Sequence, residues 1–74
     1  MSVTLLIVSR AVADSGITWS NPTKQDYAEE DAAKSAFQEN PDRGDLHAVI
    51  VDRNGKRLWV GRADQSGQVE WRRG

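Results

Sequence analysis

The chain of 74 residues contains no cysteine and a single histidine, His47. It can therefore form no disulfide, and it has too few cysteine and histidine ligands for a conventional zinc site. Secreted domains of this size are usually rich in disulfides, so the composition favours a cytoplasmic protein. The length predicts one domain, residues 1–74, which buries only about 60% of its unfolded surface.

Long hydrophobic runs are also missing. The apolar segment at residues 1–8 is too short to cross a membrane as a helix. No basic residue precedes it, and Arg10 follows in place of the small residues of a signal cleavage site. We therefore expect a β-strand here and no membrane association.

Catalytic motifs are absent as well. The sequence has no Gly-x-Ser-x-Gly, no glycine-rich phosphate loop and no metal-binding histidine spacing. No partner residue for catalysis by His47 can be named, and the acidic residues Glu29, Glu30 and Asp31 suit the start of a helix better than a metal site. We predict no catalytic residues, no metal and no cofactor, and hence no enzyme.

Charge is balanced overall but not along the chain. The net charge is −1, yet residues 1–42 carry −4 and residues 43–74 carry +3. This division predicts two differently charged surfaces. The basic second half around Trp59 could contact phosphates and stack on bases, but dedicated nucleic-acid-binding domains of this size are usually clearly basic. Direct nucleic-acid binding is therefore kept only as a weak alternative.

Two segments have strong secondary-structure patterns. Residues 3–9 are rich in β-branched residues and apolar on both faces, which is typical of a central strand. Residues 25–39 carry a helical period that ends before Asn40-Pro41. Asp26 with Glu29 resembles a capping box, and Asn21 followed by Pro22 is the alternative start. The apolar face of this helix comprises Ala28, Ala32, Ala33, Ala36 and Phe37.

The last third of the sequence predicts an antiparallel meander. Residues 46–52 and 56–63 flank Asn54-Gly55, a strong hairpin signal, and residues 68–72 follow a second turn at 64–67. Residues 17–19 form either a short strand or an extended approach to the helix. We predict an α+β fold of the order β-α-β-β-β, with a single helix packed on one face of a mainly antiparallel sheet of three to four strands.

The predicted turns assign residues to the two faces of the sheet. A two-residue turn pairs Val49 with Val60 and Ile50 with Trp59, and a four-residue second turn places Val60 opposite Trp71. A shift of one residue in the second turn would instead move Trp71 to the face of Trp59. The predicted core face comprises Val49, Val51, Leu58, Val60, Val69 and Trp71.

The opposite face is the predicted partner-binding surface. A single helix covers only one side of a sheet, so Ile50 and Trp59 would stay exposed beside Arg57 and Arg72. Tryptophan between arginines is enriched at binding hot spots. The alternative is that Trp59 forms a cross-strand cluster shielded by arginine side chains.

The apolar strand at residues 3–9, the alanine-rich helix at 28–37 and the meander that ends in Trp71 together resemble small phage-encoded anti-CRISPR proteins with one helix on an antiparallel sheet. This resemblance of layout implies an inhibitor that binds a bacterial defence complex, a host nucleoprotein complex, in the host-cell cytoplasm. Our hypothesis is therefore a non-catalytic protein-binding module of phage or mobile-element origin. A homodimeric structural or accessory protein is the alternative.

Overall fold

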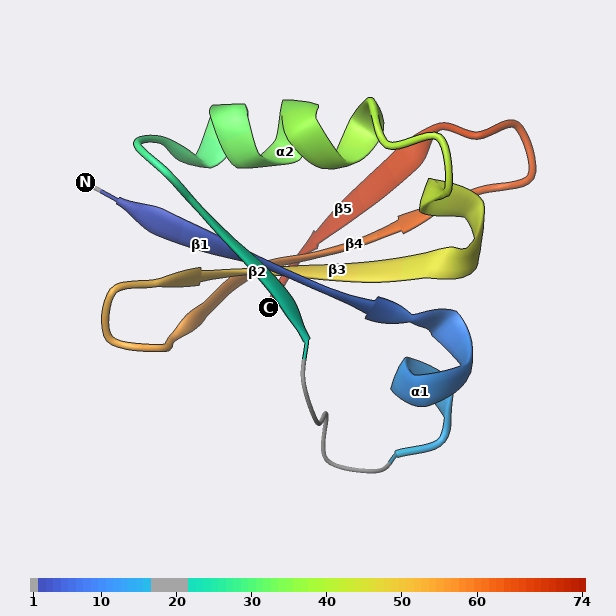
Figure 1. The fold of residues 1–74 in the computed structure, drawn as a ribbon, viewed down its shortest axis with the longest axis horizontal. Helices are drawn as coiled ribbons and strands as arrows, with labels where there is room; N and C mark the ends of the chain where they lie inside the picture. The colour runs from blue at the N-terminus through green and yellow to red at the C-terminus, as the bar shows by residue number, and fades with distance from the viewer. Residues whose placement is uncertain (1, 17–21) are drawn as a thin grey trace.

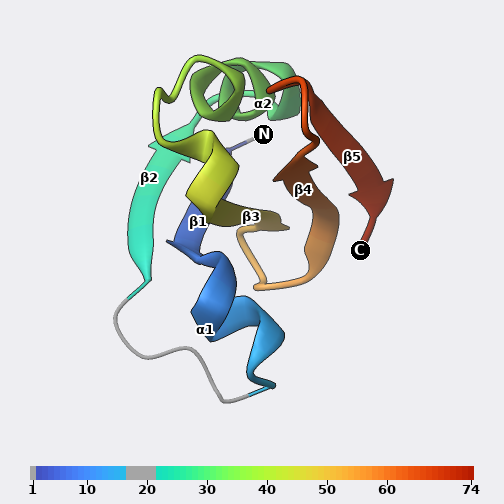
Figure 2. The same ribbon diagram turned by 90° about the vertical axis from the view of Figure 1, so that its right-hand side faces the viewer.

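The computed structural model describes residues 2–16 and 22–74. Its main feature is one antiparallel sheet of five strands in the order β2-β1-β3-β4-β5, with helix α2 lying across one face (Figures 1 and 2). In the described part of the chain, no helix is long and apolar enough to cross a membrane. The elements are β1 (Val3–Ser9), α1 (Arg10–Asp14), β2 (Thr23–Tyr27), α2 (Glu30–Gln38), the 3-10 turn η1 (Arg43–Asp45), β3 (Leu46–Asp52), β4 (Arg57–Ala63) and β5 (Val69–Arg73).

Strand β1 lies inside the sheet, as its two apolar faces predict. It pairs antiparallel with β2 on one side and with β3 on the other. Leu5 is opposite Gln25 in β2 and opposite Ile50 in β3. The predicted α+β class and antiparallel sheet are confirmed. The sheet has five strands rather than three or four, because β2 pairs with the outer side of β1.

The additional strand β2 occupies residues that the sequence assigns to the start of the helix. Helix α2 begins at Glu30, and Asp26 does not cap it, because its Oδ1 accepts a hydrogen bond from the Thr4 hydroxyl in β1 at 2.7 Å. The predicted capping box is therefore wrong, since pairing with β1 extends this segment. The alternative helix start at Asn21 and the predicted strand at 17–19 fall outside the described residues.

Helix α2 contributes the centre of the core. Ala33 and Phe37 are fully buried and Ala36 is half-buried, whereas Ala28 and Ala32 are exposed. The ring of Phe37 meets the edge of Trp71 at 5.9 Å between centroids and 69° between planes. The buried cluster is formed by Val3, Leu5, Ala33, Phe37, Ala48, Ile50, Ala63 and Val69.

Both turns of the meander have the same three-residue form. Backbone hydrogen bonds join Asp52 to Lys56 and Asp64 to Gln68, and the Oδ1 atom of each aspartate accepts from the N–H groups two and four residues later. The last residue of each loop is a glycine with positive φ, 82° at Gly55 and 88° at Gly67. The predicted turns of two and four residues are therefore both wrong.

The first hairpin keeps the predicted pair of Val49 and Val60, and the second turn changes the face of Trp71. Ile50 is opposite Trp59 as predicted, and a bulge then shifts the pairing so that Val51 is opposite Arg57. In the second hairpin Trp71 is opposite Gly61 and Arg72 is opposite Val60, one residue away from the predicted register. Trp71 therefore lies on the face of Ile50 and Trp59, and α2 covers this face. The predicted core face, with Val49 and Val60, is the one that α2 does not cover, although the predicted core residues Val49 and Val69 are buried.

Candidate functional site

The sheet face opposite α2, called here the α2-free face, is built from cross-strand rows of directly paired residues. Its central row takes one residue from each strand. Three aliphatic side chains occupy the middle of this row, and a cation stands at each end. The row runs Lys24, Leu6, Val49, Val60 and Arg72. Because directly opposed residues share a face, the fold itself brings these five together.

A hollow of about 1260 Å³ lies over the part of this face nearest β2 and the β3–β4 turn. Leu6 and Val51 form apolar parts of its lining, and Lys24, Arg53 and Arg57 contribute cations. The acids Asp26 and Asp52 also line it. The hollow is thus an amphipathic surface, with aliphatic groups inside a charged border.

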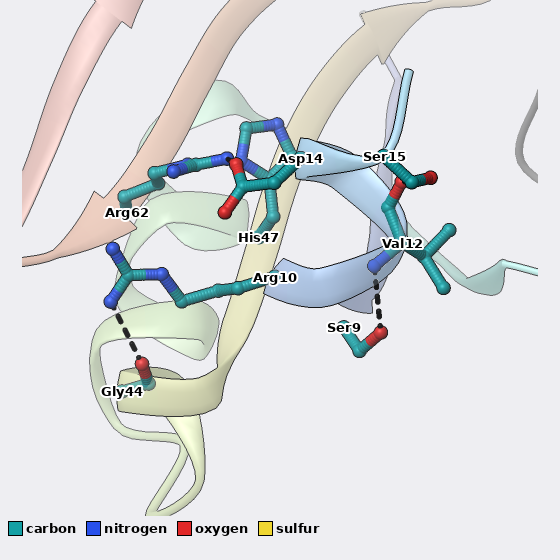
Figure 3. Close-up of polar contacts among 8 residues, drawn as sticks. All are labelled: Ser9, Arg10, Val12, Asp14, Ser15, Gly44, His47 and Arg62. Carbon is teal, nitrogen blue, oxygen red and sulfur yellow. Dashed lines mark hydrogen bonds and ion pairs between the residues drawn. The ribbon is translucent and has the colours of Figure 1, made fainter. Parts of the chain in front are cut away.

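Helix α1 covers the other end of the α2-free face and is attached there by a polar cluster. The hydroxyl of Ser9 caps the helix by accepting from the N–H of Val12 at 3.2 Å. Arg10 donates to the carbonyl of Gly44 at 3.1 Å, and Asp14 forms an ion pair with Arg62 of β4. Figure 3 shows the side chains of Asp14, Arg62 and His47 converging from three different elements.

The geometry of this cluster fixes the protonation of His47. Its Nδ1 accepts a hydrogen bond from Nε of Arg62 at 2.8 Å, so that nitrogen carries no proton. Burial lowers the pKa of His47 below its ordinary value of 6.5, and the charge of Arg62 lowers it further. The hydrogen bond from Arg62 lowers the pKa of Asp14. Arg62 therefore binds both His47 of β3 and Asp14 of α1, and this pair of contacts holds α1 on the sheet.

Trp59 belongs to a separate cluster on the α2-covered face. Its Nε1 donates to Glu30 of α2 at 2.6 Å. Nζ of Lys34 lies 3.4 Å from the ring centroid, and Cζ of Arg73 lies 4.6 Å from it. Two cation–π contacts and a hydrogen bond thus hold the half-buried ring. This arrangement matches the shielded cluster that was the alternative interpretation, with Lys34 and Arg73 as the shielding side chains.

The structure separates the four predicted partner-binding residues. Ile50 is 0% exposed beneath α2, and Trp59 lies beside it in the adjacent strand. Arg57 and Arg72 lie on the α2-free face, opposite Val51 and Val60. The prediction that all four share one open face is wrong, because a bulge places Arg57 opposite Val51 and the shorter second turn places Arg72 opposite Val60. A role of Arg57 and Arg72 in partner binding stays a prediction.

Sequence reasoning missed three contributors to the α2-free face: Leu6, Lys24 and the Arg62–Asp14 pair. Leu6 was expected in the sheet but not assigned to a face. Lys24 was placed before or within the helix. Side-chain size could have shown which face the helix covers. Ala48, Gly61 and Ala63 are small residues on one face of β3 and β4, and they leave room for the helix and its rings.

Acidic residues gather at the start of α2. Among the described residues, no group of three or more histidines, cysteines, aspartates or glutamates is placed to hold a metal ion. Glu30 and Asp31 occupy the first turn of α2, where the helix dipole favours negative charge. Helix α2 also carries the cation Lys34, so its exposed surface has charges of both signs.

Comparison of the chain with protein families, with curated proteins and with solved structures found no match.

Proposed function

We propose that the protein is a non-catalytic protein-binding module and that the α2-free face is its contact surface. The observation that carries this proposal is the central row, in which the half-buried Leu6 and Val60 flank the buried Val49 between Lys24 and Arg72. An apolar centre with a polar rim is the usual anatomy of a protein–protein interface. The adjoining hollow supplies the concave shape into which a partner side chain can insert.

The charges of this face define the partner's chemistry. Lys24 lies beside Leu6 and Arg72 beside Val60. With Arg53 and Arg57 at the hollow, these cations outnumber the acids of this face, which are Asp26, Asp52 and Glu70. Arg72 approaches Glu70 only at 3.8 Å, and both side chains are strongly exposed, so this pair holds the arginine weakly. The complementary surface is a protein patch that presents carboxylates around an apolar side chain.

The resemblance to anti-CRISPR proteins gives this proposal a biological setting. In that setting the partner is a subunit of a bacterial defence complex, and binding prevents the complex from loading or recruiting nucleic acid. The α2-free face can serve such an inhibitor because it needs no catalytic group. We propose this inhibitor role for the protein, as a phage or mobile-element product acting in the host cytoplasm.

The test begins with photo-crosslinking. A photoreactive residue replaces Arg53 beside the hollow, and in a second variant it replaces Asp31 on α2. A crosslinked protein is identified from a bacterial lysate by mass spectrometry, purified, and titrated with the unmodified chain by calorimetry. We expect the crosslink at position 53 and not at position 31.

Two matched double variants then test the surface. Arg57→Glu with Arg72→Glu changes the α2-free face, whereas Lys56→Glu with Arg73→Glu makes the same change of net charge in the turn and on the other face of β5. The first pair should weaken binding about tenfold or more, and the second by about twofold or less. Equal loss in both pairs, or none in the first, would refute the assignment of this face.

Nucleic acid is the competing ligand class for a basic face. A labelled single-stranded oligonucleotide at low ionic strength provides the discriminating measurement, because phosphate contacts weaken steeply with salt. We expect no retention. Salt-sensitive retention that Arg57→Glu with Arg72→Glu abolishes would replace the protein partner with a nucleic acid.

A further inference from the structure

The sheet has two edge strands, β2 and β5, and each has a strand neighbour on one side only. The outer edge of such a strand presents backbone N–H and C=O groups that can pair with another chain. The two edges differ in how the rest of the molecule treats them. That difference indicates which edge is available to a second chain.

The edge of β5 is engaged by helix α2 where the strand begins. Oε1 of Gln38 accepts from the N–H of Val69 at 2.9 Å, and Nε2 of Gln38 donates to the carbonyl of Gly67 at 3.2 Å. The amide side chain therefore occupies the place that a neighbouring strand would take. Glu70 and Arg72 on this strand also approach each other within the same copy.

The edge strand β2 has a different character. Thr23, Lys24, Gln25 and Asp26 are exposed, and only Tyr27 is half-buried. Among the described side chains, the one hydrogen bond recorded to a β2 side chain is from Thr4 to Asp26, and Thr4 lies in the strand on the inner side of β2. This bond orients the carboxylate of Asp26 on the α2-free face.

The sequence of β2 is complementary to itself in antiparallel register. When two copies pair about Gln25, Lys24 of each copy lies directly opposite Asp26 of the other. Two opposite-charge cross-strand pairs form at once, and Thr23 is opposite Tyr27. We propose that two copies of this chain associate through β2, related by a two-fold axis at Gln25, to form one continuous sheet of ten strands.

The geometry of this dimer has a consequence for the α2-free face. A two-fold axis perpendicular to the sheet keeps the same face of both copies on the same side. The central row of each copy then continues through Asp26 of the other copy into that copy's row of Thr4 and Val51, and the paired surface becomes twice as long. An interface made of two five-residue strands lies at the small end of the range for specific contacts, so the association is weak and depends on concentration.

Sedimentation equilibrium over a wide range of protein concentration at low ionic strength tests the proposal. The unmodified chain should show a monomer–dimer equilibrium. Lys24→Glu places two acids opposite each other across the axis, and Asp26→Lys places two lysines opposite each other. Each variant alone should therefore self-associate about tenfold more weakly or worse.

Mixing these two variants gives the decisive measurement. A copy with Lys24→Glu carries two acids in β2 and a copy with Asp26→Lys carries two lysines, so the mixed pair regains both attractive contacts. The equimolar mixture should dimerise at least as well as the unmodified chain. Circular dichroism of each variant checks that the loss of association is not a loss of folding.

Variants of β5 are the matched control, because antiparallel pairing about Trp71 would place Glu70 opposite Arg72 in the same way. Glu70→Lys and Arg72→Glu should leave the equilibrium within about twofold of the unmodified chain. The proposal is overturned by a monomer at every concentration, by single β2 variants that associate normally, or by a mixture no more associated than its components. Dissociation caused by the β5 variants would assign the interface to the other edge.

Discussion

The two faces of the sheet both carry apolar residues but differ in the sizes of their side chains. The face under α2 has small residues at its centre, Ala48 and Gly61, and large rings fill the space above them. The α2-free face has Leu6, Val49 and Val60 in one row, and within residues 2–16 and 22–74 no helix of two or more turns lies above it. Hydrophobicity alone would have placed the helix on the aliphatic row.

The difference shows that side-chain volume selects the face on which a helix packs. A Cβ atom at Gly61 would lie under 3.0 Å from three ring atoms of Trp71, so this ring rests directly on the backbone of β4. Phe37 then packs against the edge of Trp71. A valine or leucine at position 61 would raise α2 away from the sheet and break this contact.

The strongest test of this difference is the loss of a large side chain from each face. Phe37→Ala should lower the free energy of unfolding by about 3–5 kcal/mol, because it removes a fully buried ring and leaves a cavity under α2. Leu6→Ala, on the half-buried row of the other face, should cost about 2 kcal/mol, the low end for such changes. Urea denaturation measures both. Equal losses would show that the two faces contribute equally to the core.

A smaller effect is expected when one methyl group is added to the glycine beneath Trp71. Gly61→Ala should destabilise the protein by about 1–3 kcal/mol, because the indole ring must move. Gly44→Ala is the matched control: its Cβ would meet open space, so it should be neutral or stabilise by about 1 kcal/mol at most. A neutral Gly61→Ala in thermal denaturation would mean that the ring does not depend on this glycine.

The smallest effect concerns pH and acts on the α2-free face alone. Burial, and then the charges of Arg62, Arg57 and Arg10, lower the pKa of His47 below 6.5, while the charge of Asp14 raises it. The unfolded chain therefore binds a proton before the folded chain does as the pH falls. Stability should be complete above about pH 6.5 and decline below it until the folded imidazole is itself protonated.

Denaturation midpoints between about pH 5 and 8 measure this dependence, and the single histidine makes its NMR titration unambiguous. His47→Asn retains a side-chain acceptor for Arg62 and cannot be protonated in this range, so it should abolish the dependence. Amide exchange in α1 should rise below pH 6.5 while α2 stays protected. A pKa of His47 at or above 6.5 in the folded protein would contradict this account.

The sequence was informative wherever a local pattern decided the structure. The apolar run of β1 and the helical spacing of Ala33 and Phe37 predicted a central strand and a core helix, and both are confirmed. The pairing of Ile50 with Trp59 was also correct. Each of these features depends on a few residues that are close together in the sequence.

The errors arose where distant segments or single-residue shifts decided the outcome. Strand β2 has no strong pattern of its own and is extended because β1 pairs with it. The face of Trp71 was predicted wrongly because an aspartate three residues before the glycine of each loop accepts backbone hydrogen bonds and favours a three-residue turn, whereas turns of two and four residues were predicted. The change of register also divides the predicted site. Arg57 and Arg72 lie on the α2-free face, and the other two predicted residues lie under α2.

Helix α2 also joins the two edges of the sheet. It begins three residues after β2, and Gln38 at its other end binds both Gly67 and Val69 where β5 starts. Its nine residues form a stiff rod about 13 Å long. Figure 2 shows the sheet curving beneath α2, with β2 on one side of the helix and β5 on the other. A force that pulls β2 outward is therefore carried along α2 to β5, and the two edges share mechanical load although three strands separate them.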